Sequence, residues 1–368
     1  MSSKVYYSDL RANYRENLQD KLTKLMKAAG MGDIDFDHKY AAIKMHFGEP
    51  GNLAYLRPNW ARTVADFVRE RGGMPFLTDC NTLYVGGRKN ALDHLDSAML
   101  NGFFPMTTGC QIIIADGLKG TDEVAVPVEG GEYVTEAKIG RAIMDADVFI
   151  SLTHFKGHGM TGFGGALKNI GMGGGSRAGK MEMHSAGKPL VNKKRCVGCH
   201  ICATQCAHSA ISFPEKKTSI DHSRCVGCGR CLGACPRDAI YSPLDEALDI
   251  LNKKIAEYTK AIVAGRPCFH ISLAIDVSPG CDCEGSNDLA IVPNVGMFAS
   301  FDPVALDQAC VDAVNAMPAN PGSALAESSR VHEHDHFHAI HPDTHWEAAL
   351  EHGEKLGLGT REYELVKV

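Results

Sequence analysis

Apolar and polar residues follow two alternating patterns along this chain of 368 residues. Short apolar or alternating runs, such as Y-A-A-I-K-M-H-F at 40–47, predict strands, and longer amphipathic stretches between them predict helices. We predict strands at 4–8, 40–47, 75–78, 111–115, 148–152, 270–277 and 290–300. We predict one helix that ends near residue 29 and others at about 59–72, 90–102, 135–145, 244–264 and 302–316. Strands that alternate with helices indicate an α/β body built on a mostly parallel sheet.

The predicted strand 148–152 leads into the clearest candidate for a binding site in this body. The strand is apolar on both faces, which predicts a central place in the sheet, and it runs into a segment rich in histidine, lysine and glycine at 154–169. Ligands of open α/β sheets bind at the carboxyl ends of strands near helix N-termini, so we expect a pocket here. Thr161 is expected to cap the following helix, which places Lys168 one or two turns into it. The alternative is a glycine-rich connection that is packed tightly for its own sake.

Two runs of cysteines dominate residues 196–236. The cysteines at 196, 199, 202 and 206 form a C-x2-C-x2-C-x3-C run, those at 225, 228, 231 and 235 repeat its spacing, and a proline follows. This is the spacing of bacterial two-cluster ferredoxins, in which the fourth cysteine of each run ligates the other cluster. We therefore assign one [4Fe-4S] cluster to Cys196, Cys199, Cys202 and Cys235, and a second to Cys225, Cys228, Cys231 and Cys206.

Zinc and disulfide bonds are the alternatives for these eight cysteines. A zinc site usually has pairs of C-x2-C, not three evenly spaced thiols plus a fourth. Disulfides suit a secreted protein, and the start of the chain has no secretory apolar segment. We therefore expect a ferredoxin-like α+β domain with two [4Fe-4S] clusters at 190–242, inserted between the two parts of the α/β body at 1–189 and 243–368.

Composition and charge exclude some classes of protein. The chain is 44% hydrophobic and 22% charged, which is ordinary for a soluble globular protein. Its net charge is −6 with both signs spread along the sequence, so no basic stripe indicates nucleic-acid binding, and no apolar run is long enough for a membrane span. Fourteen cysteines without a secretory signal predict a reducing, cytoplasmic compartment.

Three further motifs carry candidate chemistry. The G-x4-G-K pattern at 174–180 is similar to a phosphate-binding P-loop, but Met181 stands where serine or threonine should hold magnesium, so we reject an NTPase. We expect Cys281 and Cys283 near the insert or the pocket, without a disulfide between them. This pair could bind a further metal, act as a redox pair, or be two buried thiols of a loop. The six histidines within 331–346 could bind a metal or belong to a solvated loop.

Seven segments together carry a resemblance that covers nearly the whole chain. They are I-K-M-H-F-G-E-P-G-N at 43–52, T-D-C-N-T-L-Y at 78–84, L-T-H-F-K-G-H-G-M-T-G-F-G-G-A-L-K-N-I-G-M-G at 152–173, the cysteine insert, C-D-C at 281–283, F-A-S-F-D-P-V-A-L-D-Q-A at 298–309 and G-L-G-T-R-E-Y-E-L at 357–365. They resemble the iron-sulfur-containing branch of the domain of unknown function 362 family. The resemblance implies a fold, two clusters and a redox role, but no known reaction, because the activity of that family is generally unassigned.

A second, distant resemblance concerns the stretch H-G-M-T-G-F-G-G-A-L-K from His158 to Lys168. It is similar to the motif in which lactate racemase tethers a nickel-pincer cofactor to a lysine, with a histidine ten residues before it. Leu167 replaces the arginine that precedes that lysine. The likeness supports a pocket at His158 and Lys168, not racemisation.

We expect an iron-sulfur oxidoreductase that passes single electrons from a redox partner, such as a ferredoxin or flavoprotein, to a pocket in the α/β body. Lys44, His46, His154, His158 and Lys168 would line this pocket and suit a small anionic substrate. Two other functions remain open. One is a non-catalytic electron carrier or adaptor, and the other is an isomerase-like enzyme with a pincer cofactor and structural clusters.

Overall fold

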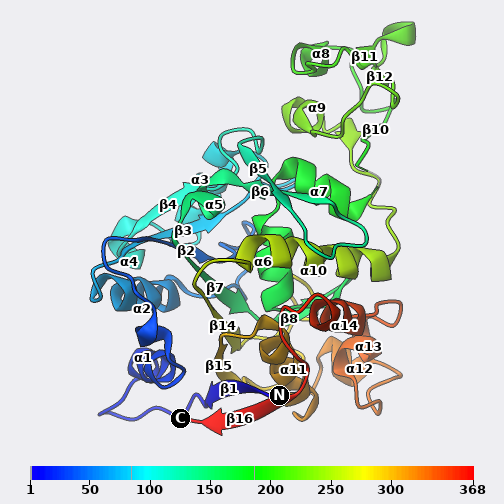
Figure 1. Ribbon diagram of the computed structural model, residues 1–368. Coiled ribbons are helices and arrows are strands. Elements are labelled where there is room, and N and C mark those ends of the chain that lie inside the picture. The colour runs from blue at the N-terminus through cyan, green and yellow to red at the C-terminus, as the bar shows by residue number, and fades with distance from the viewer. Residues whose placement is uncertain (1, 84, 186) are drawn as a thin grey trace.

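A computed structural model describes residues 2–83, 85–185 and 187–368, so the last residue of the 78–84 segment lies outside the described residues. The body is built on an eight-stranded sheet with the strand order β16-β1-β15-β14-β7-β2-β3-β4 (Figure 1). These strands are β1 Ser3–Ser8, β2 Tyr40–Lys44, β3 Met74–Asp79, β4 Gln111–Ile114, β7 Val148–His154, β14 Cys268–Ala274, β15 Gly296–Ser300 and β16 Tyr363–Lys367.

The central part of this sheet is parallel. Strands β14, β7, β2, β3 and β4 pair in parallel, whereas β15 runs antiparallel between β14 and β1, and β1 pairs in parallel with β16. The prediction of a large, mostly parallel sheet is therefore confirmed. Strand β7 lies between β14 and β2 with all of its residues buried, as its apolar sequence predicts.

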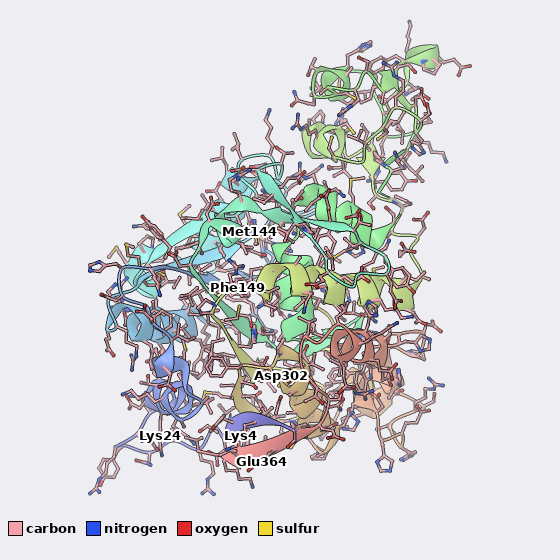
Figure 2. All side chains as sticks on the ribbon, in the orientation of Figure 1. Lys4, Lys24, Met144, Phe149, Asp302 and Glu364 are labelled. Carbon is pink, nitrogen blue, oxygen red and sulfur yellow. The ribbon has the colours of Figure 1, made fainter. Side chains whose placement is uncertain are left out.

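Helices cover both faces of the sheet, because alternate residues of each central strand point to opposite sides. Val148 and Ile150 pack in the core under α1 Leu18–Ala28 and α2 Pro58–Arg69, while Phe149 packs in the other core. Figure 2 shows Phe149 in the interior and Lys24 at the periphery. The second face is covered by α6 Ala166–Gly174, α10 Leu248–Val263, α11 Pro303–Asn315 and α14 Glu347–Lys355.

Shorter elements complete the body. They are α3 Ala91–Leu100, α4 Pro105–Thr108, α5 Arg141–Asp145, α7 Arg177–His184, α12 Ala324–Glu327, α13 His336–Ile340 and the 3-10 turn Met31–Asp33. Two hairpins, β5 Glu123–Pro127 with β6 Glu136–Gly140 and β8 Lys156–His158 with β9 Gly162–Gly164, lie outside the main sheet. No helix in the described ranges combines the length and the apolar character that a bilayer crossing requires.

Three predicted elements differ from the structure. The predicted helix 135–145 is strand β6 followed by the short helix α5, because residues 136–140 pair with β5, a partner that local periodicity does not reveal. Of the predicted strand 290–300, only β15 at 296–300 is extended into the sheet. Thr161 does not cap a helix: its hydroxyl donates to the carbonyl of Phe163, and α6 begins at Ala166.

The cysteine-rich segment 190–242 extends from one end of the body (Figure 1). It contains two antiparallel strand pairs, β10 Leu190–Val191 with β13 Ile240–Tyr241 and β11 Ile211–Ser212 with β12 Ser219–Ile220. Two short helices, α8 Ile201–Thr204 and α9 Arg230–Ala234, and the 3-10 turn Pro214–Lys216 complete it. The two cysteine runs adopt matching backbones. Positive φ angles recur at equivalent positions, 67° at Gly198 and 73° at Gly227, and 49° at Ser209 and 47° at Asp238.

Candidate functional site

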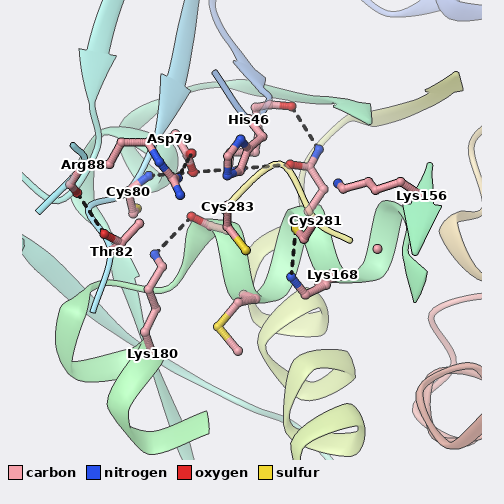
Figure 3. Close-up of a pocket in the computed structure, with 15 residues that line it drawn as sticks. His46, Asp79, Cys80, Thr82, Arg88, Lys156, Lys168, Lys180, Cys281 and Cys283 are labelled. Atoms are coloured by element: carbon pink, nitrogen blue, oxygen red, sulfur yellow. Dashed lines mark hydrogen bonds and ion pairs between the residues drawn. The ribbon is translucent and has the colours of Figure 1, made fainter. Parts of the chain in front are cut away.

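A cavity of about 70 Å³ lies at the carboxyl ends of β2, β3 and β7, where an open α/β sheet places its ligands (Figure 3). Helix α6, helix α7 and the loop after β14 close it. Its lining residues are Lys44, His46, Asp79, Cys80, Thr82, Arg88, Lys156, Gly164, Lys168, Asn169, Met172, Gly173, Lys180, Cys281 and Cys283. Of the five side chains that the sequence predicts for the pocket, Lys44, His46 and Lys168 line this cavity.

Five cationic side chains line the cavity, and three of them form ion pairs with carboxylates. Lys44 Nζ lies 3.0 Å from Asp79 Oδ1, and Lys156 Nζ lies 3.5 Å from a carboxylate oxygen of Asp282. Arg88 likewise pairs with a carboxylate, that of Glu49. The ammonium group of Lys180, in contrast, donates to the carbonyl of Gly175 at 2.5 Å.

Lys168 also lacks a carboxylate partner within the described part of the chain; its Nζ lies 3.9 Å from Cys281 Sγ. An anion in the cavity would therefore meet two lysines, Lys168 and Lys180, that have no carboxylate within 4 Å in the described part of the chain. The sequence offered a signal for Lys180, the G-K of the rejected P-loop pattern. It also offered one for Lys156, which lies between the two histidines chosen at 154 and 158.

His46 supplies the cavity with a neutral hydrogen-bond donor. Its Nδ1 accepts the backbone N–H of Gly48 at 2.9 Å, so the proton of the neutral ring sits on Nε2. Burial lowers the pKa of His46 well below its usual value, and the nearby cations Arg88, Lys156 and Lys44 lower it further. The buried Nε2 has no hydrogen-bond partner within the described chain. A ligand oxygen in the cavity would satisfy it.

His154 is not a lining residue, in contrast to the prediction from sequence. Its Nδ1 lies 2.9 Å from a carboxylate oxygen of Asp282, and its Nε2 lies 2.8 Å from the carbonyl oxygen of Ile275. Both nitrogens face acceptors, so a ring protonated on both nitrogens satisfies both contacts. His154 therefore anchors the loop that carries Cys281 and Cys283, one layer behind the cavity wall.

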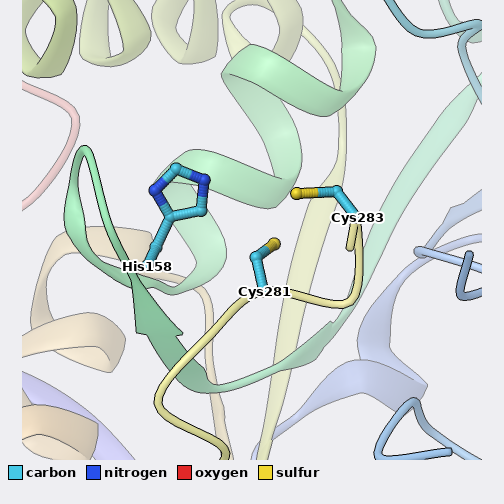
Figure 4. A group of neighbouring side chains, drawn as sticks. All are labelled: His158, Cys281 and Cys283. Atoms are coloured by element: carbon cyan, nitrogen blue, oxygen red, sulfur yellow. The ribbon is translucent and has the colours of Figure 1, made fainter. Parts of the chain in front are cut away.

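His158 also lies outside the lining but faces the two cavity thiols. One of its ring nitrogens and the sulfurs of Cys281 and Cys283 all lie within 4.8 Å of one another (Figure 4). Its Nδ1 accepts two backbone N–H groups, from Met160 at 3.1 Å and Thr161 at 3.2 Å. His158 and Lys168 thus meet at Cys281, the sulfur that both approach. Burial lowers the pKa of His158 well below its usual value, and Lys168 lowers it further.

The two thiols differ strongly in acidity. The pKa of Cys281 lies well below its usual value, because the thiol of Cys283 donates to its sulfur and, although burial opposes this, Lys168 and Lys156 lie beside it. The pKa of Cys283 is raised well above its usual value by that same hydrogen bond and by burial. Cys281 is therefore the more acidic of the two thiols. Neither cysteine is in a disulfide.

Helix α6 holds Lys168 in place through residues on either side. Asn169 donates to the carbonyl oxygens of Lys44 and Leu152, which ties the helix to β2 and β7. At the start of the helix, Asp307 of α11 accepts the N–H groups of Ala166 at 2.6 Å and Leu167 at 2.9 Å. A carboxylate from another helix therefore takes the capping role that the sequence assigned to Thr161. As a result Lys168 lies in the first turn of α6.

The eight cysteines of the insert line two separate cavities. One is lined by Cys196, Cys199, Cys202 and Cys235 together with Val197, Thr218, Pro236, Arg237, Ala239 and Ile240. The other includes Cys206, Cys225, Cys228 and Cys231 in its lining. Each cavity therefore takes three cysteines from one run and the fourth from the other.

Several of these sulfurs accept hydrogen bonds from nearby backbone and hydroxyl groups. The N–H of Ala210 donates to Cys206 at 3.4 Å, and at the equivalent place in the second run the N–H of Ala239 donates to Cys235 at 3.3 Å. The hydroxyl of Thr218 donates to Cys196 Sγ at 3.3 Å. Such donors stabilise negative charge on cysteine sulfur and are the usual surroundings of ligating thiolates.

Two short stretches of chain are shared between the pocket and the insert. Lys180 lines the pocket, while the next residue, Met181, packs in a small core with Cys231 of the insert. Thr82 also lines the pocket, and Leu83 packs in the same core. In both stretches, therefore, one residue lines the pocket and the next residue packs against the insert.

The histidines of 331–346 do not gather at one point. The Nε2 atoms of His336 and His341 contact the carbonyl oxygens of Met317 and Pro279, respectively. His338 lies near Asp335 and Glu347, in a group whose ligand atoms are all within 4.8 Å of one another. The suggestion of a metal site in this segment thus reduces to one partly exposed group with a single histidine.

The fold and this site define a class of protein: an α/β body with a basic, thiol-containing pocket and a cysteine-rich insert beside it. The family model described as "Domain of unknown function (DUF362)" matches residues 41–312, and the chain belongs to this family.

Known proteins that match the chain are distant. The thylakoid-associated protein sll1697 of Synechocystis sp. (strain ATCC 27184 / PCC 6803 / Kazusa) is 28% identical over 157 residues, which cover 40% of this chain and 43% of that protein. The lactate racemase apoprotein of Thermoanaerobacterium thermosaccharolyticum aligns with a TM-score of 0.37 at 12% identity, over 74% of this chain and 51% of that one. A protein of Thermotoga maritima gives the same TM-score and identity, over 92% and 58% of the two chains. The chain thus spans about half the length of these relatives.

Proposed function

We propose that this protein is an iron-sulfur oxidoreductase. In this proposal the insert holds two [4Fe-4S] clusters that take single electrons from a redox partner of the ferredoxin or flavoprotein class. The electrons serve the reduction of a small anionic substrate in the pocket of the α/β body. The observation that carries the proposal is the division of the eight cysteines into two cavities, each with three thiols from one run and one from the other.

The surroundings of the cysteines and of the pocket support this function. The N–H and hydroxyl donors around Cys196, Cys206 and Cys235 suit thiolate ligands, and bound clusters would supply one-electron chemistry. The pairs Thr82–Leu83 and Lys180–Met181 connect the insert to the pocket through adjacent residues. Lys168, Lys180 and the Nε2–H of His46 provide positive charge and a donor for an anion.

Metal analysis of protein purified without oxygen tests the proposal. We expect eight iron atoms and eight acid-labile sulfides per chain, as two [4Fe-4S] clusters require. Cys206→Ser should lose the cluster held mainly by the second run, although Cys206 belongs to the first. Cys268→Ser is the matched control, because Cys268 lies in β14, away from the insert, and its thiol donates only to backbone carbonyls that a hydroxyl can also reach. Stoichiometric zinc in place of iron would refute the assignment.

The same preparation separates the other candidate functions. An electron carrier would oxidise and reduce its clusters without converting any small molecule, so that variants of Lys168 and Lys180 would behave like the native protein. A pincer-type isomerase would contain nickel and would carry a mass increment on Lys168. Because His158 and Lys168 both lie near the sulfur of Cys281, the intact-mass measurement tests this alternative directly.

A further inference from the structure

The loop that carries Cys281 and Cys283 is held rigidly against the pocket. The residue between the two cysteines, Asp282, is fully buried and lies 2.9 Å from His154 Nδ1 and 3.5 Å from Lys156 Nζ. The backbone adds further ties, because the N–H of Glu49 donates to the carbonyl of Asp282 at 2.9 Å. The two thiols therefore face the cavity from a fixed base.

Three groups surround the sulfur of Cys281. Lys168 Nζ lies 3.9 Å away, the thiol of Cys283 donates to it, and a ring nitrogen of His158 is within 4.8 Å. His158 Nδ1 already accepts two backbone N–H groups, so this neighbouring nitrogen is Nε2 and carries the ring proton. Figure 4 shows the ring turned edge-on toward both sulfurs. An ammonium group, an imidazole N–H and a thiol thus converge on one sulfur, and a thiolate would accept from all three.

A mononuclear metal site is the competing interpretation of the same three residues. A metal-bound imidazole needs a lone pair on the nitrogen that faces the metal and an N–H on the other nitrogen. His158 has the reverse arrangement, because the nitrogen remote from the sulfurs is the acceptor. The geometry therefore suits a protonated Nε2 beside a thiolate better than a metal ligand.

We propose that Cys281 and Cys283 form a redox-active dithiol that exchanges with a small anionic disulfide bound in the pocket. The thiolate of Cys281 attacks one sulfur of the bound disulfide, and the other half leaves as a thiolate. Cys283 then attacks Cys281 in the mixed disulfide and gives up its proton to the second leaving thiolate. The product is an intramolecular disulfide between Cys281 and Cys283. Lys168 and Lys180 supply the positive charge that an anionic disulfide requires.

The disulfide must be reduced before the pair can react again. This step alone rests on the proposed function, because the clusters supply its electrons. Reduction of the intramolecular disulfide breaks the S–S bond and consumes two electrons and one proton. The proton goes to Cys283, and Cys281 remains a thiolate beside Lys168. The electrons come from a one-electron donor of the ferredoxin class, and two clusters per chain match the number needed.

Reaction with an anionic aromatic disulfide, 5,5′-dithiobis(2-nitrobenzoate), tests the dithiol in the full, anaerobically prepared protein. We expect the native chain to release two aromatic thiolates in a fast phase that Cys281→Ser lacks, and to end two hydrogens lighter without an adduct. Cys283→Ser should release one thiolate and keep the aromatic adduct on Cys281. Cys268→Ser should react like the native chain, because this thiol lies outside the pocket. Circular dichroism checks that every variant is folded.

The pH dependence of the fast phase separates an activated thiolate from a merely accessible thiol. The groups that face the sulfur are Lys168 of α6, Lys156 and His158 of β8, and Asp282 and Cys283 of the loop. Lys168→Met should slow the fast phase about tenfold at neutral pH, equivalent to a rise of about one unit in thiol pKa, and Lys168→Arg should restore most of the rate.

Two results would overturn the proposal. One is a fast phase that survives in Cys281→Ser, and the other is a native protein that retains the adduct instead of forming an internal disulfide. Iron and sulfide contents are measured on the same samples. Loss of the clusters with an intact dithiol reaction would count against the proposed function alone, and intact clusters without the dithiol reaction would count against this inference alone.

Discussion

Replacement of Asp282 by asparagine tests how much the charge of this residue stabilises the loop that carries Cys281 and Cys283. The carboxylate is fully buried between His154 and Lys156, and the asparagine keeps its shape while removing its charge. Loss of one partner from a buried ion pair costs about 3–5 kcal/mol, because the remaining charge stays buried without compensation. The amide oxygen can still accept one N–H from His154, which preserves about 1 kcal/mol. We therefore expect the free energy of unfolding of the body to fall by about 2–4 kcal/mol at pH 7.

The pH dependence of this loss has a definite sign. Burial alone would raise the pKa of Asp282, but His154 and Lys156 outweigh it, so the pKa lies well below its usual value. A carboxyl group with a lowered pKa stabilises the folded state above its unfolded pKa of about 3.9, and this contribution is lost as the pH falls further. The difference in stability between the native protein and Asp282→Asn should therefore be constant from pH 7 to about pH 5 and shrink below about pH 4.

Urea unfolding followed by circular dichroism measures this difference at each pH. Asp288→Asn is the matched control, because Asp288 is an exposed aspartate a few residues further along the chain. The control should change the free energy of unfolding by less than about 0.5 kcal/mol. A loss below about 1 kcal/mol in Asp282→Asn, or a loss that grows as the pH falls, would refute the account of a buried, charged anchor.

Two further predictions concern helix α6. Gly171→Ala should destabilise the protein by about 1–3 kcal/mol, because its methyl group would overlap the carbonyl oxygen of Ile255 in α10, whereas Gly159→Ala, with open space around it, should unfold like the native protein in the same urea titration. Asp307→Ala should cost about 1–2 kcal/mol by removing the carboxylate that accepts the N–H groups of Ala166 and Leu167, and equal stability of Asp307→Ala and native protein would show that the cap does not matter.

The central sheet could be predicted because its signals are local. Apolar runs such as 148–152 identify buried strands, and their alternation with helices indicates parallel pairing. Strand β6 could not be recognised, because residues 136–140 become a strand only by pairing with β5. The position of β15, antiparallel between β14 and β1, likewise depends on partners far away in the sequence.

For the pocket, too, the sequence predicts the features that depend on neighbouring residues and not those that depend on contacts far apart in the chain. The histidines and lysines at 154–168 marked the correct end of β7, but the sequence could not show that His154 turns away toward Asp282, 128 residues later. Asp79 directly follows the predicted strand 75–78, yet its role as the partner of Lys44 needs the register of β2 against β3. The tautomer of His158, set by the backbone of its own hairpin, is also a product of the fold.

The matched backbones of the two cysteine runs have a consequence for how the two halves of the insert depend on each other. Each cysteine of the second run lies 29 positions after its counterpart, as Cys225 follows Cys196 and Cys235 follows Cys206. Neither run completes a four-thiol cavity alone, because the fourth cysteine always comes from the other run. Each half of the insert therefore depends on the other for a complete set of thiols, and deletion of either half would leave three thiols in one cavity and one in the other.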